Sequence, residues 1–129
     1  MDYSQLSDFE INKLVAYALG NADVGRPFDE IIGAACQFTV FKNSGLNREG
    51  EIVIRPMKVT KDFCNSPADA WPIIIESRIG IIPAPDAGKW KAAHREVDED
   101  DTPHHFTQGD NPLRCAMIVF LKMQDAKHA

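Results

Sequence analysis

The chain has 129 residues, of which 44% are hydrophobic, and a formal net charge of −5 at neutral pH. This length suffices for one domain with one continuous core. The acidic balance argues against extended nucleic acid as a partner bound through a broad basic surface, although it is compatible with a local basic pocket. No apolar run approaches the roughly 20 residues that span a bilayer, and the acidic start lacks the pattern of a signal peptide. We therefore expect a soluble, cytosolic protein with no membrane partner.

The first predicted element is an amphipathic helix over residues 7–19. Ser7 and Glu10 fit a capping box at its start, and Gly20 fits the left-handed position that ends a helix. Apolar side chains recur there at the spacing of one helical face. They are Ile11, Leu14, Val15, Ala18 and Leu19.

The next segment, residues 21–61, predicts strands. Residues 36–41 and 51–60 are rich in β-branched and aromatic side chains, and residues 42–50 between them have the composition of a turn. This pattern indicates a β-hairpin. The preceding residues 22–35 fit either a loop or a short helix.

A second helix is predicted over residues 66–78. In one reading Ser66 is the cap and Asp69 the acidic half of a capping box, so Pro72 falls in the second turn and kinks the helix. In the other reading Asp69 is the cap, and Pro72 lies in the first turn at little cost. In both readings one face carries Trp71, Ile74, Ile75 and Arg78.

Two further strands are predicted at 78–85 and 89–97, with Trp90 as the large side chain of the second. Pro83 and Pro85 place the end of the first strand at a sheet edge or in a loop. Residues 98–111 indicate a long polar loop.

The last predicted element is a helix over residues 111–125, with Asn111 as its cap and Pro112 at its first position. It is apolar almost all round, which is typical of a helix buried on most sides. We expect it to lie against the sheet and against another helix or a second subunit, and a homo-oligomer follows from the latter. The elements together predict an α+β fold, a single domain over 1–129 with about three helices packed on a small antiparallel sheet.

Several of these stretches resemble a known family. They are "CNSPADAWPIIIESRIGI", "KWKAAH", "DNPLRCAMIVFLKM" and, near the N-terminus, "LSDFEINKLVAYALG". They resemble the NinX-like family of bacteriophage proteins over residues of about 4–20 and 62–126, and residues 21–61 look longer than the family's usual pattern. The resemblance implies an alpha-beta-alpha sandwich-like fold and a phage accessory protein in the host bacterial cytoplasm, a setting in which members generally have no assigned activity.

Few residues suggest catalysis or a cofactor. Cys36, Cys64 and Cys115 are far apart without a C-x-x-C pair, so we expect three buried thiols; pairing of Cys64 or Cys115 with His94 as a nucleophile is disfavoured. A metal site is likewise disfavoured against a solvated acidic loop. Its ligands would be Asp98, Asp100, Asp101, His104 and His105. No phosphate-binding, dinucleotide or hydrolase motif occurs, and we expect a non-catalytic protein without a cofactor or metal.

Aromatic and cationic residues near helix starts are the candidates for ligand binding. A tryptophan stacks on a base, and an arginine beside a helix N-terminus binds an anion, so together they suit a small nucleotide. The candidate residues are Asn65, Ser66, Trp71, Arg78, Trp90, Asn111 and Arg114. Core tryptophans and simple helix caps are the structural alternative. The predicted function is sequestration of a small anionic, nucleotide-like ligand such as a host defence signal. The alternative is an inhibitor or adaptor acting on a host enzyme through an acidic surface that includes residues 98–101.

Overall fold

A computed structural model of the chain describes residues 2–19, 30–32, 35–94 and 105–127. Within these ranges, three α-helices and two antiparallel three-stranded sheets form one α+β domain, which confirms the predicted fold class. The helices are α1 (Asp8–Ala18), α2 (Pro67–Ser77) and α3 (Pro112–Lys127). The first sheet contains β1 (Glu30–Ile32), β2 (Ala35–Leu46) and β3 (Ile52–Lys61), and the second contains β4 (Gly80–Pro83), β5 (Trp90–His94) and β6 (His105–Gly109).

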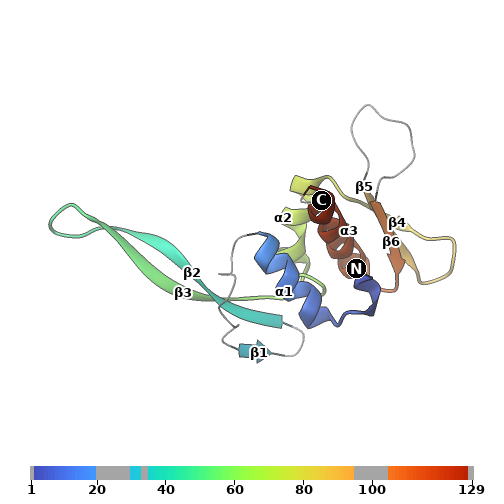
Figure 1. Ribbon diagram of the computed structural model, residues 1–129, viewed down its shortest axis with the longest axis horizontal. Coiled ribbons are helices and arrows are strands. Elements are labelled where there is room, and N and C mark those ends of the chain that lie inside the picture. Colours follow the sequence, from blue (N-terminus) through green and yellow to red (C-terminus); the bar gives the residue numbers. More distant parts are fainter. Residues whose placement is uncertain (1, 20–29, 33–34, 95–104, 128–129) are drawn as a thin grey trace.

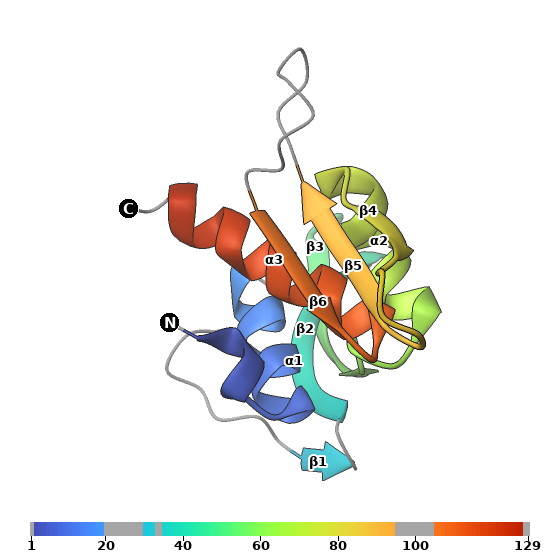
Figure 2. The ribbon, with the colours of Figure 1, turned by 90° about the vertical axis from the view of Figure 1, so that its right-hand side faces the viewer.

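Helix α3 is the centre of the body. It packs against the β4–β5–β6 sheet on one side and against α1 and α2 on the others (Figure 2). Every residue from Cys115 to Leu121 is buried, including Ile118 and Val119, which are 3% and 0% exposed. The apolar circumference of this helix is therefore covered by elements of the same chain. Its apolarity consequently provides no argument for a second subunit.

Helix α1 begins as predicted, because the Ser7 hydroxyl accepts the Glu10 backbone N–H at 3.2 Å. Ile11 and Val15 are fully buried. The predicted apolar face is wrong at its C-terminal end, because Ala18 and Leu19 are exposed. Asn12 and Ala16 occupy the buried stripe instead. Gly20, predicted to end the helix, lies outside the described residues.

Helix α2 has Ser66 as its N-cap residue, but the Ser66 side chain makes no capping hydrogen bond. The predicted capping box is wrong in this respect, because the Asp69 carboxylate accepts the Asp62 backbone N–H at 3.0 Å instead. The helix continues through Pro72, as the first of the two sequence readings requires. Its buried face consists of Ala70, Ile73 and Ile74.

The end of α2 departs from the predicted helix boundary by one residue and has a left-handed cap. Arg78 adopts φ 57° and ψ 46°, the conformation that glycine usually supplies. The Arg78 N–H donates to the Ile75 carbonyl at 3.2 Å, and the Ile79 N–H donates to the Ile74 carbonyl at 3.0 Å. This pair of bonds is a Schellman motif, and burial of the Ile79 side chain completes it.

Strands β2 and β3 form a long two-stranded arm, here defined as residues 35–61, that projects from the body (Figure 1). The hairpin is confirmed, but its first strand is longer than predicted, because residues 42–46 belong to β2. The turn itself is short and is closed by Asn47, whose side-chain oxygen accepts the backbone N–H groups of Glu49 and Glu51. Residues 30–32, left open as loop or helix, form the short strand β1.

In the second sheet, β4 and β5 pair antiparallel as predicted, and Pro83 ends β4 opposite Trp90. The prediction of a loop over 98–111 is wrong for residues 105–109, which form β6 along the other side of β5. In this strand Phe106 and Gln108 point outward, whereas Thr107 and Gly109 point toward α3. The inward positions are therefore not occupied by large apolar residues, and the sequence lacks the alternation that usually indicates a strand. Pairing with β5 therefore decides the conformation there.

Candidate functional site

Three of the seven predicted site residues lie in one hydrogen-bonded junction where α1 and α3 begin and the chain enters α2. The Asn111 side-chain oxygen accepts the backbone N–H groups of Leu113 and Arg114, at 3.0 and 3.2 Å. Its amide donates to the Cys64 carbonyl at 2.7 Å and to the Asn65 side-chain oxygen at 3.1 Å. Asn111 thus caps α3, as predicted, and ties it to the residues that precede α2.

Arg114 completes this N-terminal junction rather than facing solvent. Its guanidinium donates to the Asp8 carboxylate at 2.6 Å and to the backbone carbonyls of Leu6 and Ser4, at 2.6 and 3.3 Å. The same Asp8 carboxylate accepts from the Asn65 amide at 3.2 Å. These contacts occupy the N–H groups of Arg114 and Asn65 that an anionic ligand would need. They give Arg114 and Asn65 a structural role.

Asn12 is the junction residue that the sequence did not reveal. Its side chain is fully buried. It donates to the Asp62 carboxylate at 2.9 Å and accepts the Cys64 backbone N–H at 3.0 Å. Asn12 occupies a position that reads as polar in an amphipathic helix, so only the approach of the 62–65 segment shows its role.

The other predicted site residues lie apart from the junction. Trp71 is 59% exposed on the outer face of α2, and Trp90 is 36% exposed at the start of β5. The structural alternative of two core tryptophans is thereby wrong. Arg78 lies two turns beyond Trp71, at the end of α2, whereas Ser66 contributes only its backbone carbonyl to the first turn. The structure therefore does not bring the seven residues into one site.

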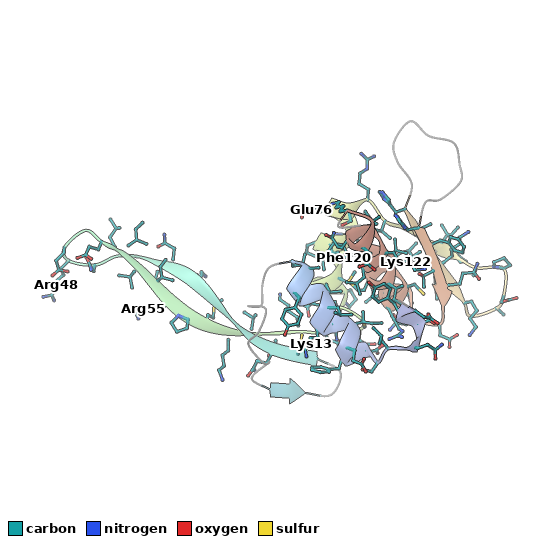
Figure 3. All side chains as sticks on the ribbon, viewed as in Figure 1. Lys13, Arg48, Arg55, Glu76, Phe120 and Lys122 are labelled. Atoms are coloured by element: carbon teal, nitrogen blue, oxygen red, sulfur yellow. The ribbon has the colours of Figure 1, made fainter. Side chains whose placement is uncertain are left out.

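A groove of about 900 Å³ lies among the described residues. It lies where all three helices end, because the last residues of α1, α2 and α3 all line it. Figure 3 labels Glu76 of α2 and Phe120 of α3 on this side of the body. Its apolar floor and walls consist of Leu19, Phe63, Pro72, Ile73, Phe120 and Met123. This volume and lining are typical of small-molecule sites.

Three cations lie around the groove. Lys61 pairs with Asp69 at 3.4 Å, a contact that occupies its ammonium. Arg78 and Lys127 also line the groove. Arg78 makes no side-chain hydrogen bond or ion pair with another residue in the described ranges, and its side chain is exposed. Of the two predicted site arginines, Arg78 is thus the one that remains available to a ligand.

Two histidines close the groove at the end of the second sheet. His94 and His105 are cross-strand neighbours on β5 and β6, and their rings are stacked with centroids 6.5 Å apart and planes inclined by 16°. The His94 Nδ1 atom is buried and has no hydrogen-bond partner in the described part of the chain. A buried ring nitrogen without a partner costs free energy, which a ligand donor or a bound water would recover.

Helix geometry gives this groove its polarity. Helix C-termini leave carbonyl groups without intrahelical partners and carry partial negative charge. Three such ends converge here, and they favour hydrogen-bond donors, while Arg78 and Lys127 favour an anion. The arrangement suits a ligand that combines donor groups with an anionic group. The sequence indicated His94 and His105 as candidates for other kinds of site, but no local pattern indicated that Lys61 or Lys127 lines a groove.

Nucleophilic or metal chemistry finds little support in the described residues. All three cysteines are buried, as predicted, and none forms a disulfide. Burial raises the pKa of the Cys36 thiol to about 11 and raises the pKa values of Cys64 and Cys115 as well, so the thiolate is scarce at neutral pH. No group of three or more potential metal ligands occurs in the described ranges. Asp98, Asp100, Asp101 and His104 lie outside these ranges.

Comparison with protein families shows which family this chain belongs to. The family model described as bacteriophage P22, NinX, matches residues 2–124. The chain belongs to this NinX family. The match spans residues 21–61 as well as the two ends, so the arm falls inside the family match. No curated protein matches the chain. Among the helices of this NinX protein that the structure describes, none is both long and apolar enough to cross a bilayer.

Proposed function

We propose that this NinX protein is a non-catalytic phage binding protein that sequesters a small anionic, nucleotide-like ligand in the groove at the helix C-termini. The observation that carries the proposal is the exposed Arg78 guanidinium at the rim of a groove of about 900 Å³, held there by a left-handed cap. A guanidinium forms bidentate contacts with phosphate oxygens. A host defence signal in the bacterial cytoplasm is the kind of ligand that a phage accessory protein would sequester.

The remaining groups of the groove suit the rest of such a ligand. The stacked imidazoles of His94 and His105 offer a flat surface to a base, and the helix carbonyls accept from amino and hydroxyl groups. Trp71 lies on the outer face of the helix whose end carries Arg78, outside the groove lining. We therefore assign stacking to the histidines and leave Trp71 as a contact for a ligand that extends beyond the rim.

Calorimetric titration against a panel of linear and cyclic nucleotides tests this proposal. We expect the wild type to bind at least one of them, and Arg78→Gln to weaken that binding by about ten- to a hundred-fold, the loss of one charge-assisted contact. Arg55→Gln, which removes an exposed arginine from the arm, is the matched control and should bind like the wild type. Thermal melting of all three proteins checks that each is folded.

Other outcomes would replace the proposal. If the folded wild type binds no nucleotide, the groove is not a nucleotide site, and the adaptor acting on a host enzyme becomes the better function. If Arg78→Gln and Arg55→Gln bind equally well, the ligand lies elsewhere on the molecule. Formation of a product during the titration would show that the protein is an enzyme.

A further inference from the structure

The charge of this chain is divided unevenly between the arm and the rest of the molecule. Residues 35–61 contain five Lys or Arg and two Glu, a net charge of +3. The remaining residues contain nine Lys or Arg and seventeen Asp or Glu, a net charge of −8. The total of −5 therefore conceals a basic projection on an acidic protein.

One pair of cations on the arm lies in an arrangement that destabilises the hairpin when no partner is bound. Lys42 and Arg55 are direct cross-strand partners on β2 and β3, so their side chains lie on the same face. Both are exposed, and neither makes a side-chain hydrogen bond or ion pair within the described ranges. Like charges directly opposite each other destabilise a hairpin. An anion bound between them would relieve this repulsion.

The other cations lie on the opposite face of the ribbon and in the turn. Lys58 lies three residues after Arg55, an odd separation that places it on the opposite face of the ribbon. Arg48 lies in the turn, and Figure 3 shows it at the far end of the arm with Arg55 part-way along. Arg48 is accompanied in the turn by Glu49 and Glu51, so the positive charge of the arm lies along its strands and not at its tip. Positive charge on both faces fits a partner that surrounds the ribbon, rather than one that covers a single face.

Apolar side chains accompany these cations. Leu46 and Ile52 are cross-strand partners beside the turn, and Ile54 lies two residues after Ile52 on β3. They are 69%, 63% and 55% exposed. The arm thus combines exposed aliphatic side chains, of the kind that contact thymine methyl groups in the major groove, with cations of the kind that contact phosphates.

The length of the arm separates its charges from the acidic body. Cys36, which is fully buried in the body, is six residues before Lys42 and ten before Leu46. At about 3.3 Å per residue, the Lys42–Arg55 pair is roughly 20 Å and the tip roughly 33 Å from this anchor. Both distances exceed the Debye length of about 8 Å at physiological ionic strength. The charge of the body therefore does little to repel a polyanion at the outer half of the arm.

From this combination we propose that the β2–β3 arm binds duplex DNA by entering its major groove. This groove, about 12 Å wide, admits a two-stranded β-ribbon and has phosphates along both walls. The major groove of duplex RNA is too narrow and deep for such a ribbon. This interaction is separate from the ligand groove at the helix C-termini and does not depend on it.

Fluorescence anisotropy of a labelled DNA duplex of about 20 base pairs tests the proposal with the full-length protein across a salt series. For about three phosphate contacts, the logarithm of the affinity should fall with the logarithm of salt concentration with a slope of about −2 to −3. The double variant Lys42→Gln/Arg55→Gln should lose roughly ten- to a hundred-fold in affinity near 0.1 M salt, and its slope should shrink by about 2. It should melt no lower than the wild type, because it removes a repulsive pair.

The matched control is Arg78→Gln/Lys127→Gln, which removes one arginine and one lysine from the ligand groove and should leave DNA binding nearly unchanged. A duplex RNA of the same length should bind more weakly than the DNA. Equal losses in the two double variants, or equal binding of RNA and DNA, would overturn the major-groove assignment. If the wild type binds no duplex at 50 mM salt, the proposal fails. Self-association that depends on Lys42 and Arg55 would then identify a second copy as the partner of the arm.

Discussion

The two ends of the three-helix layer differ in how many of their polar side chains are hydrogen-bonded within the protein. At the junction of helix starts, Asn65, Asn111 and Arg114 are held by several hydrogen bonds each. At the groove of helix ends, Arg78 and the His94 Nδ1 atom have no such partners in the described ranges. Residues of similar type thus stabilise the fold at one end and remain available to a ligand at the other. A chemically suitable residue becomes a binding candidate only where the fold leaves it unsatisfied.

The largest effect should come from the junction arginine. Arg114→Ala removes the contacts to Asp8, Leu6 and Ser4 and leaves the partly buried Asp8 carboxylate without a cation, with the Asn65 amide as its remaining side-chain donor in the junction. We expect a loss of about 2–4 kcal/mol in the free energy of unfolding, measured by urea denaturation. Lys89→Ala, which breaks the exposed pair with Asp110, should have a much smaller effect, because solvent screens an exposed ion pair. Similar losses in the two variants would mean that the junction is no more structural than the surface.

The next effect concerns the buried amide of the same junction. Asn12→Ala leaves the Cys64 backbone N–H without its partner and removes a donor to Asp62. The expected loss is about 2–3 kcal/mol, because an unsatisfied buried group keeps its desolvation cost. Asn43→Ala, whose side chain accepts only the exposed Gly45 N–H in the arm, is the matched control and should cost about 1 kcal/mol or less. The urea midpoints of the two variants decide between these values.

Alkaline pH should weaken the contact between Tyr3, near the N-terminus, and Asp125, near the end of α3. Burial and the hydrogen bond that Tyr3 donates to Asp125 raise the pKa of the Tyr3 phenol from 10.0 to about 12. The folded state therefore holds this proton more tightly than the unfolded state, so the contribution of Tyr3 to stability is fully present below pH 10 and is lost as the pH rises through 12. Tyr3 alone contributes on the order of 2 kcal/mol to this loss.

Thermal melting from pH 8 to pH 12 measures this dependence. Cys36, with a pKa of about 11, adds a loss of stability that begins near pH 9. Tyr3→Phe should start from a lower melting temperature at pH 8 and should then lose less on further titration above pH 10. The same alkaline slope in wild type and Tyr3→Phe would contradict the assignment to Tyr3.

The smallest effect should come from the groove and have the opposite sign. Arg78→Gly relieves the cost of a left-handed non-glycine residue at the end of α2 and should stabilise the protein by roughly 0.5–1 kcal/mol. Arg78→Gln keeps that backbone cost and should be close to neutral in stability. Both variants should lose the proposed nucleotide affinity. If Arg78→Gly destabilises the fold, the arginine side chain has a structural role, and the contrast between the two ends of the helices disappears.

Much of the local structure was readable from the sequence, because it depends on near neighbours. Ser7 before α1 and Asn111 with Pro112 before α3 have a capping chemistry that acts within one turn of helix, and both ends were predicted correctly. The hairpin of β2 and β3 was predicted from its composition. The burial of the three cysteines followed from their spacing and the absence of a pairing pattern.

The sequence by itself therefore determined the α+β class, the starts of α1 and α3 and the hairpin, since propensity and capping act over a few residues. Only the tertiary structure decided which polar residues were satisfied. Arg114 lies 106 residues from Asp8, and Asn12 lies 52 residues from Cys64. The strand at 105–109 formed because β5 offered it an edge. The groove exists because three helices end at the same place. Such contacts join distant segments through packing of the whole core, and no local pattern records them.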